Sequence, residues 1–131
     1  MPNLCDKESY DCNDLIKIVG ILRSPEGCPW DRAQDHHTIR NNFLEEAYEA
    51  VEAIDLESSA LLREELGDVL FSAVNIARFL KVDAEDSLNA STEKFINRFC
   101  KVEQLAQQQG IDLEQTSVEQ MEQLWKQAKN Q

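Results

Sequence analysis

Apolar residues recur along this chain at the three- and four-residue spacing of amphipathic helices, and no segment shows the alternation of a strand. The pattern predicts about five helices, over residues 13–24, 38–55, 59–81, 83–109 and from 117 to the C-terminus. Asn13 is the expected N-cap of the first helix. Two S/T/D-x-x-E/D/Q capping boxes, Asp83-Ala-Glu-Asp86 and Ser117-Val-Glu-Gln120, mark the last two starts. We therefore expect an all-α fold.

A segment rich in turn-forming residues separates the first two predicted helices. Two prolines and a glycine lie close together in SPEGCPWDRAQDHH, which predicts an ordered loop and not a helix. Trp30 in this loop either plugs the core or borders a ligand pocket, and the usual burial of large aromatic rings favours the plug. His36 and His37 are adjacent and would point about 100° apart on a helix, so they cannot chelate one metal together. We expect them at the surface near a helix start, with catalysis as the less favoured alternative.

The size and composition favour one domain. The 131 residues, 42% of them apolar, predict a single domain over residues 1–131, with residues 1–12 as a flexible N-terminal segment and a core completed by oligomerisation. No apolar run approaches the roughly 20 residues of a membrane-spanning helix, and no signal peptide is evident. The four cysteines lack a C-x-x-C pair, which favours free thiols. We expect a cytoplasmic protein.

The charge is strongly acidic and unevenly distributed. A formal net charge of −12 makes nucleic acid and anionic membranes poor partners. Solubility alone is one explanation for such a charge. Residues 44–68, however, concentrate nine acids against a single base, Arg63. These acids are Glu45, Glu46, Glu49, Glu52, Asp55, Glu57, Glu64, Glu65 and Asp68.

Two i,i+3 acid pairs, Glu46/Glu49 and Glu65/Asp68, lie on successive predicted helices. At about 100° per residue, Glu46, Glu65 and Asp68 border the apolar faces, whereas Glu49 lies beyond that border. An unpaired buried carboxylate costs several kcal/mol, so the arrangement favours a bound cation over a solvated acidic face. A hard divalent ion such as Mg²⁺ prefers carboxylate oxygens. Gly67, between the two acids of the second pair, suggests the close approach of a neighbour or ligand.

Basic and aromatic residues gather in the last two helices. Lys94, Arg98 and Lys101 share one side of their helix, either pairing with glutamates or forming a phosphate clamp. Trp125 and Lys129 form an i,i+4 pair. The tryptophan either closes the core or stacks on a nucleobase, and periodicity does not choose between these two roles.

Several motifs together resemble the MazG nucleoside triphosphate pyrophosphohydrolases. GCPWD at residues 27–31 is followed by E-E-x-x-E at residues 45–49 and E-x-x-D at residues 65–68, in the order found in that family. The resemblance extends from Leu22 to Lys129. It implies an antiparallel helical bundle of the all-α NTP pyrophosphatase type, assembled as a homodimer or a higher oligomer through the second and third helices.

The resemblance also implies roles for individual residues. The Mg²⁺ ligands, for which Mn²⁺ can substitute, would be Glu46, Glu49, Glu65 and Asp68. KFINRF implies phosphate contacts from Lys94 and Arg98, and LWKQAK implies nucleotide contacts from Trp125 and Lys129. Glu45 or Glu46 would act as the general base.

The implied reaction is hydrolysis of a nucleoside triphosphate between the α and β phosphates, giving a monophosphate and pyrophosphate. Two departures stand against the family pattern: Thr92 replaces an asparagine common in members, and longer members carry two copies of the domain. The front half resembles the GCPWD-bearing copy, and the back half the copy that ends in W-x-x-x-K. The alternatives are a non-catalytic helical interaction module and a hydrolase for a phosphoribosyl nucleotide or an alarmone.

Overall fold

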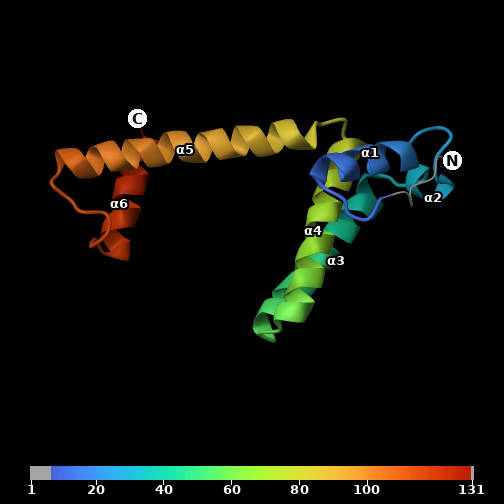
Figure 1. Cartoon of the computed structure of the whole chain (residues 1–131), viewed down its shortest axis with the longest axis horizontal. Coiled ribbons are helices and arrows are strands. Elements are labelled where there is room, and N and C mark those ends of the chain that lie inside the picture. Colours follow the sequence, from blue (N-terminus) through green and yellow to red (C-terminus); the bar gives the residue numbers. More distant parts are fainter. Residues whose placement is uncertain (1–6, 131) are drawn as a thin grey trace. The chain divides into compact units, whose positions relative to one another are not determined.

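The computed structural model describes residues 7–130, and these residues form six α-helices and no strand (Figure 1). The all-α prediction is confirmed, with one helix more than expected. The helices are α1 (Cys12–Leu22), α2 (Pro29–Arg32), α3 (His36–Asp55), α4 (Ser59–Phe79), α5 (Ala84–Gln108) and α6 (Val118–Lys129). None of the described helices is long and apolar enough to cross a membrane.

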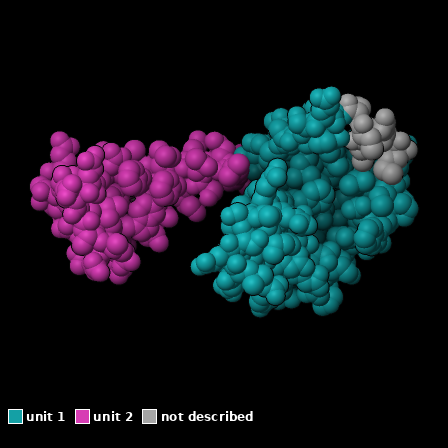
Figure 2. Space-filling view, turned by 60° about the horizontal axis from the view of Figure 1, so that its bottom comes forward, with its two compact units in different colours: residues 1–85 teal, residues 86–131 magenta. Residues whose placement is uncertain are grey.

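The chain divides into two compact units, shown in teal and magenta in Figure 2. Unit 1 ends at Glu85 and unit 2 begins at Asp86. The expectation of a single domain over residues 1–131 stays a prediction. So does the flexible N-terminal segment, of which residues 1–6 lie outside the described residues.

Unit 1 is built on the antiparallel hairpin of α3 and α4, with α1 packed on α4 (Figure 1). The chain reverses at residues 56–58, where Glu57 adopts a left-handed φ of 54° and the Ser58 hydroxyl accepts a hydrogen bond from the Leu61 amide at 3.3 Å. The buried apolar side chains of the three helices are small or β-branched: Val19, Ile39, Ala53 and Val74. The hairpin therefore fixes which faces of α3 and α4 oppose each other.

Two helices begin earlier than expected because aspartates cap them. Asp11 and not Asn13 is the N-cap of α1, and its carboxylate accepts a hydrogen bond from the Asp14 amide at 2.9 Å. Asp35 caps α3 in the same way through the Thr38 amide at 2.9 Å, so α3 begins at His36. At α6 the expected N-cap, Ser117, is confirmed by its hydrogen bond from the Gln120 amide at 3.2 Å.

The proline-rich segment contains the one-turn helix α2, so the expectation of a helix-free loop is wrong. Pro29 occupies the first helical position, where a backbone N–H would have no acceptor within the helix, so proline costs no hydrogen bond there. Gly27 lies against the end of α1: a Cβ there would be 2.1 Å from the Ile21 carbonyl oxygen, so only glycine fits. Trp30 is 81% exposed, and the interpretation of Trp30 as a plug over the core is wrong for unit 1.

Apart from the adjacent residues and the nearby backbone of α4 itself, no described atom lies within 4 Å of a Cβ built at Gly67, so no packed neighbour in the described part of this chain requires a glycine there. Cys12, Cys28 and Cys100 are free thiols, as expected, and Cys5 lies outside the described residues.

Unit 2 pairs the second half of α5 with α6. Val102, Leu105 and Ala106 of α5 pack against Leu124 and Ala128 of α6 to form its core. The turn after α5 is closed by a hydrogen bond of 2.8 Å from the Ile111 amide to the Ala106 carbonyl, with Gly110 at a left-handed φ of 68°. The half-buried Trp125 packs against this core, in agreement with one of its two expected roles.

Candidate metal centre and phosphate-binding surface

The α3–α4 hairpin brings three carboxylates together. One oxygen from each of Glu46, Glu49 and Glu65 lies within 4.8 Å of the other two, and we call these residues the acidic cluster. Glu46 and Glu49 are one turn apart on α3, and Glu65 faces them from α4. Three oxygen ligands that converge from two fixed helices are the kind of set that Mg²⁺ or Ca²⁺ takes in proteins.

The residues that form the acidic cluster differ in part from those expected from the helical wheel, that is, from the direction of each acid at about 100° per residue. Glu46 and Glu65 are half-buried, as the wheel indicated, but the exposed Glu49 also reaches the cluster although the wheel placed it beyond the border. Asp68 is exposed and its oxygens lie outside the group. A glutamate carboxylate extends one methylene farther than an aspartate carboxylate, so Glu49 can bend toward the cluster while Asp68 does not reach it. Glu45 is exposed beside Glu46.

The electrostatics of the acidic cluster are unfavourable without a cation. Burial raises the pKa of Glu46, and the negative charges of Glu49, Asp68 and Glu45 raise it further. Burial also raises the pKa of Glu65, followed by its hydrogen bond with Glu49 and the charges of Glu49 and Asp68. The Oε2 atoms of both Glu46 and Glu65 are buried and have no hydrogen-bond partner. Two buried carboxylate oxygens without partners, on side chains that belong to one cluster, fit a divalent cation.

Four basic residues of unit 2 line one hollow of about 460 Å³, which we call the cationic hollow. Lys94, Arg98 and Lys101 line it from successive turns of α5, and Lys129 lines it from α6. Glu93 is the one acid among the lining residues, so the hollow is mainly positive. Ammonium and guanidinium groups at this spacing can bind phosphate oxygens.

A second hollow of unit 2, of about 550 Å³, lies beside the cationic hollow and shares Lys129 with it. Trp125 and Met121 give it an apolar wall, and the Trp125 ring lies 5.7 Å from the Phe95 ring, centroid to centroid. The structure thus places Trp125 and Lys129 on one hollow, as their i,i+4 spacing predicts. Their roles toward a nucleotide stay predictions.

The two histidines lie at the surface at the start of α3, as expected. The His37 Nε2 atom is 3.2 Å from the Asn41 amide nitrogen. The His36 ring meets the Phe79 ring edge to face at 5.2 Å. Neither histidine belongs to the acidic cluster.

The raised pKa values predict how the metal-free protein responds to pH. Because folded Glu46 and Glu65 bind protons more tightly than they do in the unfolded chain, the free energy of unfolding should fall as pH rises above the ordinary glutamate pKa of about 4.3. Urea unfolding in EDTA at a series of pH values measures this. Glu65→Gln should flatten the decline, and Glu52→Gln, which removes an exposed charge from α3, is the matched control. A free energy of unfolding that rises over this range would contradict the geometry of the acidic cluster.

Comparison with known proteins identifies the relatives of the chain. The model of the MazG nucleotide pyrophosphohydrolase domain matches residues 34–103, which include the whole acidic cluster. A nucleoside triphosphate pyrophosphohydrolase/pyrophosphatase MazG of Thermotoga maritima is 42% identical over 89 residues, covering 65% of this chain and 35% of that protein. A nucleoside triphosphate pyrophosphohydrolase of Escherichia coli K12 is 41% identical over 100 residues, covering 72% of this chain and 38% of that protein. The chain thus spans little more than a third of the length of these two relatives.

A solved structure matches over almost its whole length. The crystal structure of a mazG-related protein from Thermotoga maritima is similar with a TM-score of 0.62 and 28% identity, covering 91% of this chain and 99% of that chain. The family model covers more than half of the sequence, and the solved structure has the same fold. The chain belongs to the MazG nucleotide pyrophosphohydrolase domain family.

Proposed function

We propose that this chain is a Mg²⁺-dependent nucleoside triphosphate pyrophosphohydrolase that cleaves NTPs or dNTPs between the α and β phosphates. The observation that carries this proposal is the acidic cluster, in which the buried Oε2 atoms of Glu46 and Glu65 have no partner. The cluster falls within the residues that match the MazG family. A carboxylate cluster that fits a divalent cation, in a family named for the hydrolysis of nucleotides, supports this reaction best.

Glu46, Glu49 and Glu65 would hold Mg²⁺, or Mn²⁺ in its place, and Asp68 would join them from the next turn of α4. The ion would supply charge neutralisation for the phosphates and a lowered pKa for bound water. The carboxylates themselves would fix the ion against the hairpin, because α3 and α4 are held rigidly by their packing. Both orphaned oxygens would gain a partner on binding.

A carboxylate would accept the proton of the attacking water, and Glu45 and Glu46 are the candidates. The water oxygen forms a bond to the α phosphorus while the bond from that phosphorus to the bridging oxygen breaks, and pyrophosphate leaves. Glu45 is exposed, and Glu46 is half-buried with a raised pKa. If Glu45 is the base, Glu45→Gln should lower kcat and keep the Mg²⁺ affinity. Glu46→Gln should lower the Mg²⁺ affinity as well, because Glu46 is also a proposed ligand.

In unit 2, the cationic hollow would bind phosphate groups. Lys94 and Arg98 would neutralise the charge that develops on the leaving pyrophosphate. Trp125 and Lys129 would contact the nucleoside, with the ring offering a flat face for a base. The hollows that they line support this assignment, since both have room for a ligand group and carry few acids.

We also propose that the protein is a cytoplasmic homodimer whose interface involves α3 and α4. Many large apolar side chains on these helices are exposed in unit 1, which is unusual for a surface that remains in water. They include Leu44 (41%), Tyr48 (73%), Val51 (52%), Leu66 (51%), Leu70 (61%) and Phe71 (45%). A second copy would cover these faces and complete the core. The acidic charge argues against nucleic acid and anionic membrane as partners.

The product assay tests the proposed reaction. Each common NTP and dNTP is incubated with the protein and Mg²⁺, and we expect equal amounts of monophosphate and pyrophosphate. Glu65→Ala should lower kcat/KM by at least about a hundredfold, because it removes a metal ligand at the reacting centre. Glu52→Ala, on the exposed side of α3, is the control and should retain activity.

Other products would lead to different conclusions. Diphosphate with free phosphate would refute cleavage between the α and β phosphates. Binding without turnover of any nucleotide would favour a phosphoribosyl nucleotide or an alarmone as the substrate. Neither binding nor turnover would favour a non-catalytic interaction module.

Sedimentation velocity tests the dimer. We expect a dimer for the native chain and a shift toward monomer for Leu70→Glu, which places a charge on the exposed apolar face of α4. Leu88→Glu makes the same change on the exposed part of α5 and serves as the control. A native monomer that still hydrolyses nucleotide would refute the proposed assembly.

A further inference from the structure

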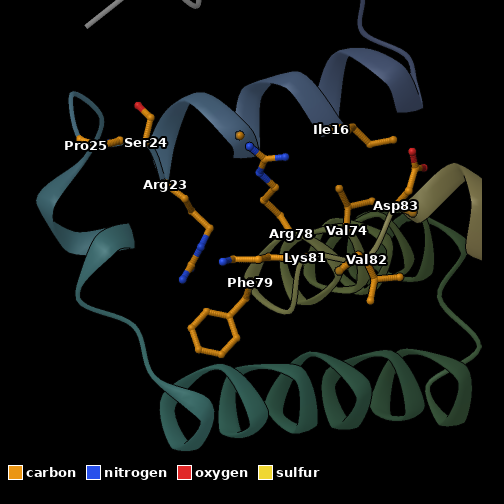
Figure 3. Close-up of a pocket in the computed structure, with 13 residues that line it drawn as sticks. Ile16, Arg23, Ser24, Pro25, Val74, Arg78, Phe79, Lys81, Val82 and Asp83 are labelled. Atoms are coloured by element: carbon orange, nitrogen blue, oxygen red, sulfur yellow. The ribbon is translucent and has the colours of Figure 1, made fainter.

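Unit 1 contains a pocket of about 700 Å³ between the C-terminal ends of α1 and α4, away from the acidic cluster. Three cations line it, namely Arg23, Arg78 and Lys81. Its apolar lining includes Phe79 and Val74. Figure 3 shows the side chains of Arg23 and Lys81 extending into the same space, with the Phe79 ring at its edge. We call this the α1–α4 pocket.

Among the described residues, Arg23, Arg78 and Lys81 form no ion pair with a carboxylate. One acid, Asp83, also lines the α1–α4 pocket, so the cations of the lining outnumber the acids by three to one. The Arg23 guanidinium lies over the Phe79 ring, with Cζ 4.5 Å from the ring centroid, and this contact fixes its position. The Arg23 Nη1 atom is buried and donates no hydrogen bond. A buried N–H of a charged group without an acceptor is costly, and a bound anion would satisfy it.

The backbone places the other two cations. The Arg78 guanidinium lies close over Gly20, where a Cβ would be 3.4 Å from its Cζ, Nε and Nη2 atoms. Lys81 lies in the turn that ends α4 and has a left-handed φ of 59°. In this turn the Lys81 amide donates a hydrogen bond to the Arg78 carbonyl, and the Val82 amide donates one to the Ala77 carbonyl. Glycine is the usual residue at this position of a Schellman turn. The negative end of the α4 dipole favours cations here, but it does not satisfy the buried Nη1 atom of Arg23.

We propose that the α1–α4 pocket binds a phosphate-bearing metabolite of nucleotide size. The phosphate oxygens would accept hydrogen bonds from Arg23, Arg78 and Lys81, and the apolar wall with Phe79 would contact the organic part. The volume lies within the range of small-molecule sites, about 300–1,000 Å³, and is far larger than a phosphate ion needs. A purely inorganic anion would leave the apolar wall unused.

This pocket is separate from the acidic cluster, and the proposal does not rest on the proposed hydrolysis. Arg78 follows Asp68 by ten residues on α4, which is about 15 Å along the helix axis at 1.5 Å per residue. The α1–α4 pocket holds three cations, so it needs no divalent ion to bind phosphate. Binding there should therefore persist in EDTA.

The test uses the whole chain in EDTA with AMP or inorganic pyrophosphate as the probe. Backbone amide shifts of Gly20 and Val82 report on the α1–α4 pocket and not on the cationic hollow of unit 2. We expect saturable shifts with AMP and weaker binding of pyrophosphate. Arg23→Gln and Lys81→Gly should each weaken AMP binding about tenfold, since each removes one charge-assisted contact.

The variants include their own control for folding. Lys81→Gly places a glycine at a position with a left-handed φ, which glycine adopts without steric strain, so the substitution should not unfold the chain. Glu57→Gly makes the same backbone change at the corresponding position after α3, where Glu57 has a φ of 54°, and it should leave AMP binding unchanged. Glu65→Ala should abolish hydrolysis and leave these shifts intact, so the two proposals fail independently.

Three results would overturn the proposal. One is the absence of any saturable shift at Gly20 and Val82 with either probe. Another is unchanged AMP affinity in both Arg23→Gln and Lys81→Gly. The third, pyrophosphate binding as tightly as AMP, would overturn the assignment of an organic ligand.

Discussion

The repulsion among Glu46, Glu49 and Glu65 is the constraint on which the rest of this structure depends. The three carboxylates are held within 4.8 Å of one another by a hairpin whose helices cannot separate without losing their packing. Like charges so close together, with two oxygens buried and unpartnered, favour either protonation or a divalent cation. The apolar contacts of α3 and α4 must therefore offset an unfavourable electrostatic term. If the acidic cluster holds a divalent cation, as proposed, binding would relieve this repulsion and the relief would add to the affinity for the ion.

Acidic and basic side chains gather in different regions of this chain. The acids converge in the middle of the α3–α4 hairpin, while cations line the ends of α1 and α4 and the faces of α5 and α6. The net charge of −12 hides these positive regions, because most acids elsewhere are exposed on helix surfaces. A phosphate-bearing ligand of the kind proposed for these regions would meet local positive charge although the overall field repels anions. Salt screens the long-range repulsion between exposed charges, whereas it screens contacts within a pocket much less.

The sequence could predict whatever depends on periodicity. The helical stripes and the turn at residues 56–58 follow from apolar spacing and turn residues, and with them the pairing of α3 and α4. The wheel identified Glu46 and Glu65 because both lie at the edge of an apolar face. The wheel gives the direction in which a side chain leaves the helix but not how far the side chain reaches. For that reason it missed Glu49, whose carboxylate reaches the cluster, and favoured Asp68, whose shorter side chain does not.

Features that depend on packing between distant segments could not be predicted. Trp30 gave the signal of a core residue, as a large aromatic ring usually does, but its side chain is exposed in unit 1. Gly27 allows its backbone to touch α1, which the loop sequence alone does not reveal. Arg23 and Lys81 are far apart in the sequence and meet only because α1 packs on the end of α4. No spacing rule joins such residues.

The response of stability to Mg²⁺ tests the central claim most directly. The free energy of unfolding is measured by urea unfolding across a Mg²⁺ titration, for the native chain and for Glu65→Gln. If the acidic cluster holds the ion, the native chain gains about 1.4 kcal/mol when Mg²⁺ reaches ten times its Kd, and Glu65→Gln gains far less. A native chain that does not respond to Mg²⁺, or a variant that responds equally, would contradict the assignment of the cluster as a metal centre.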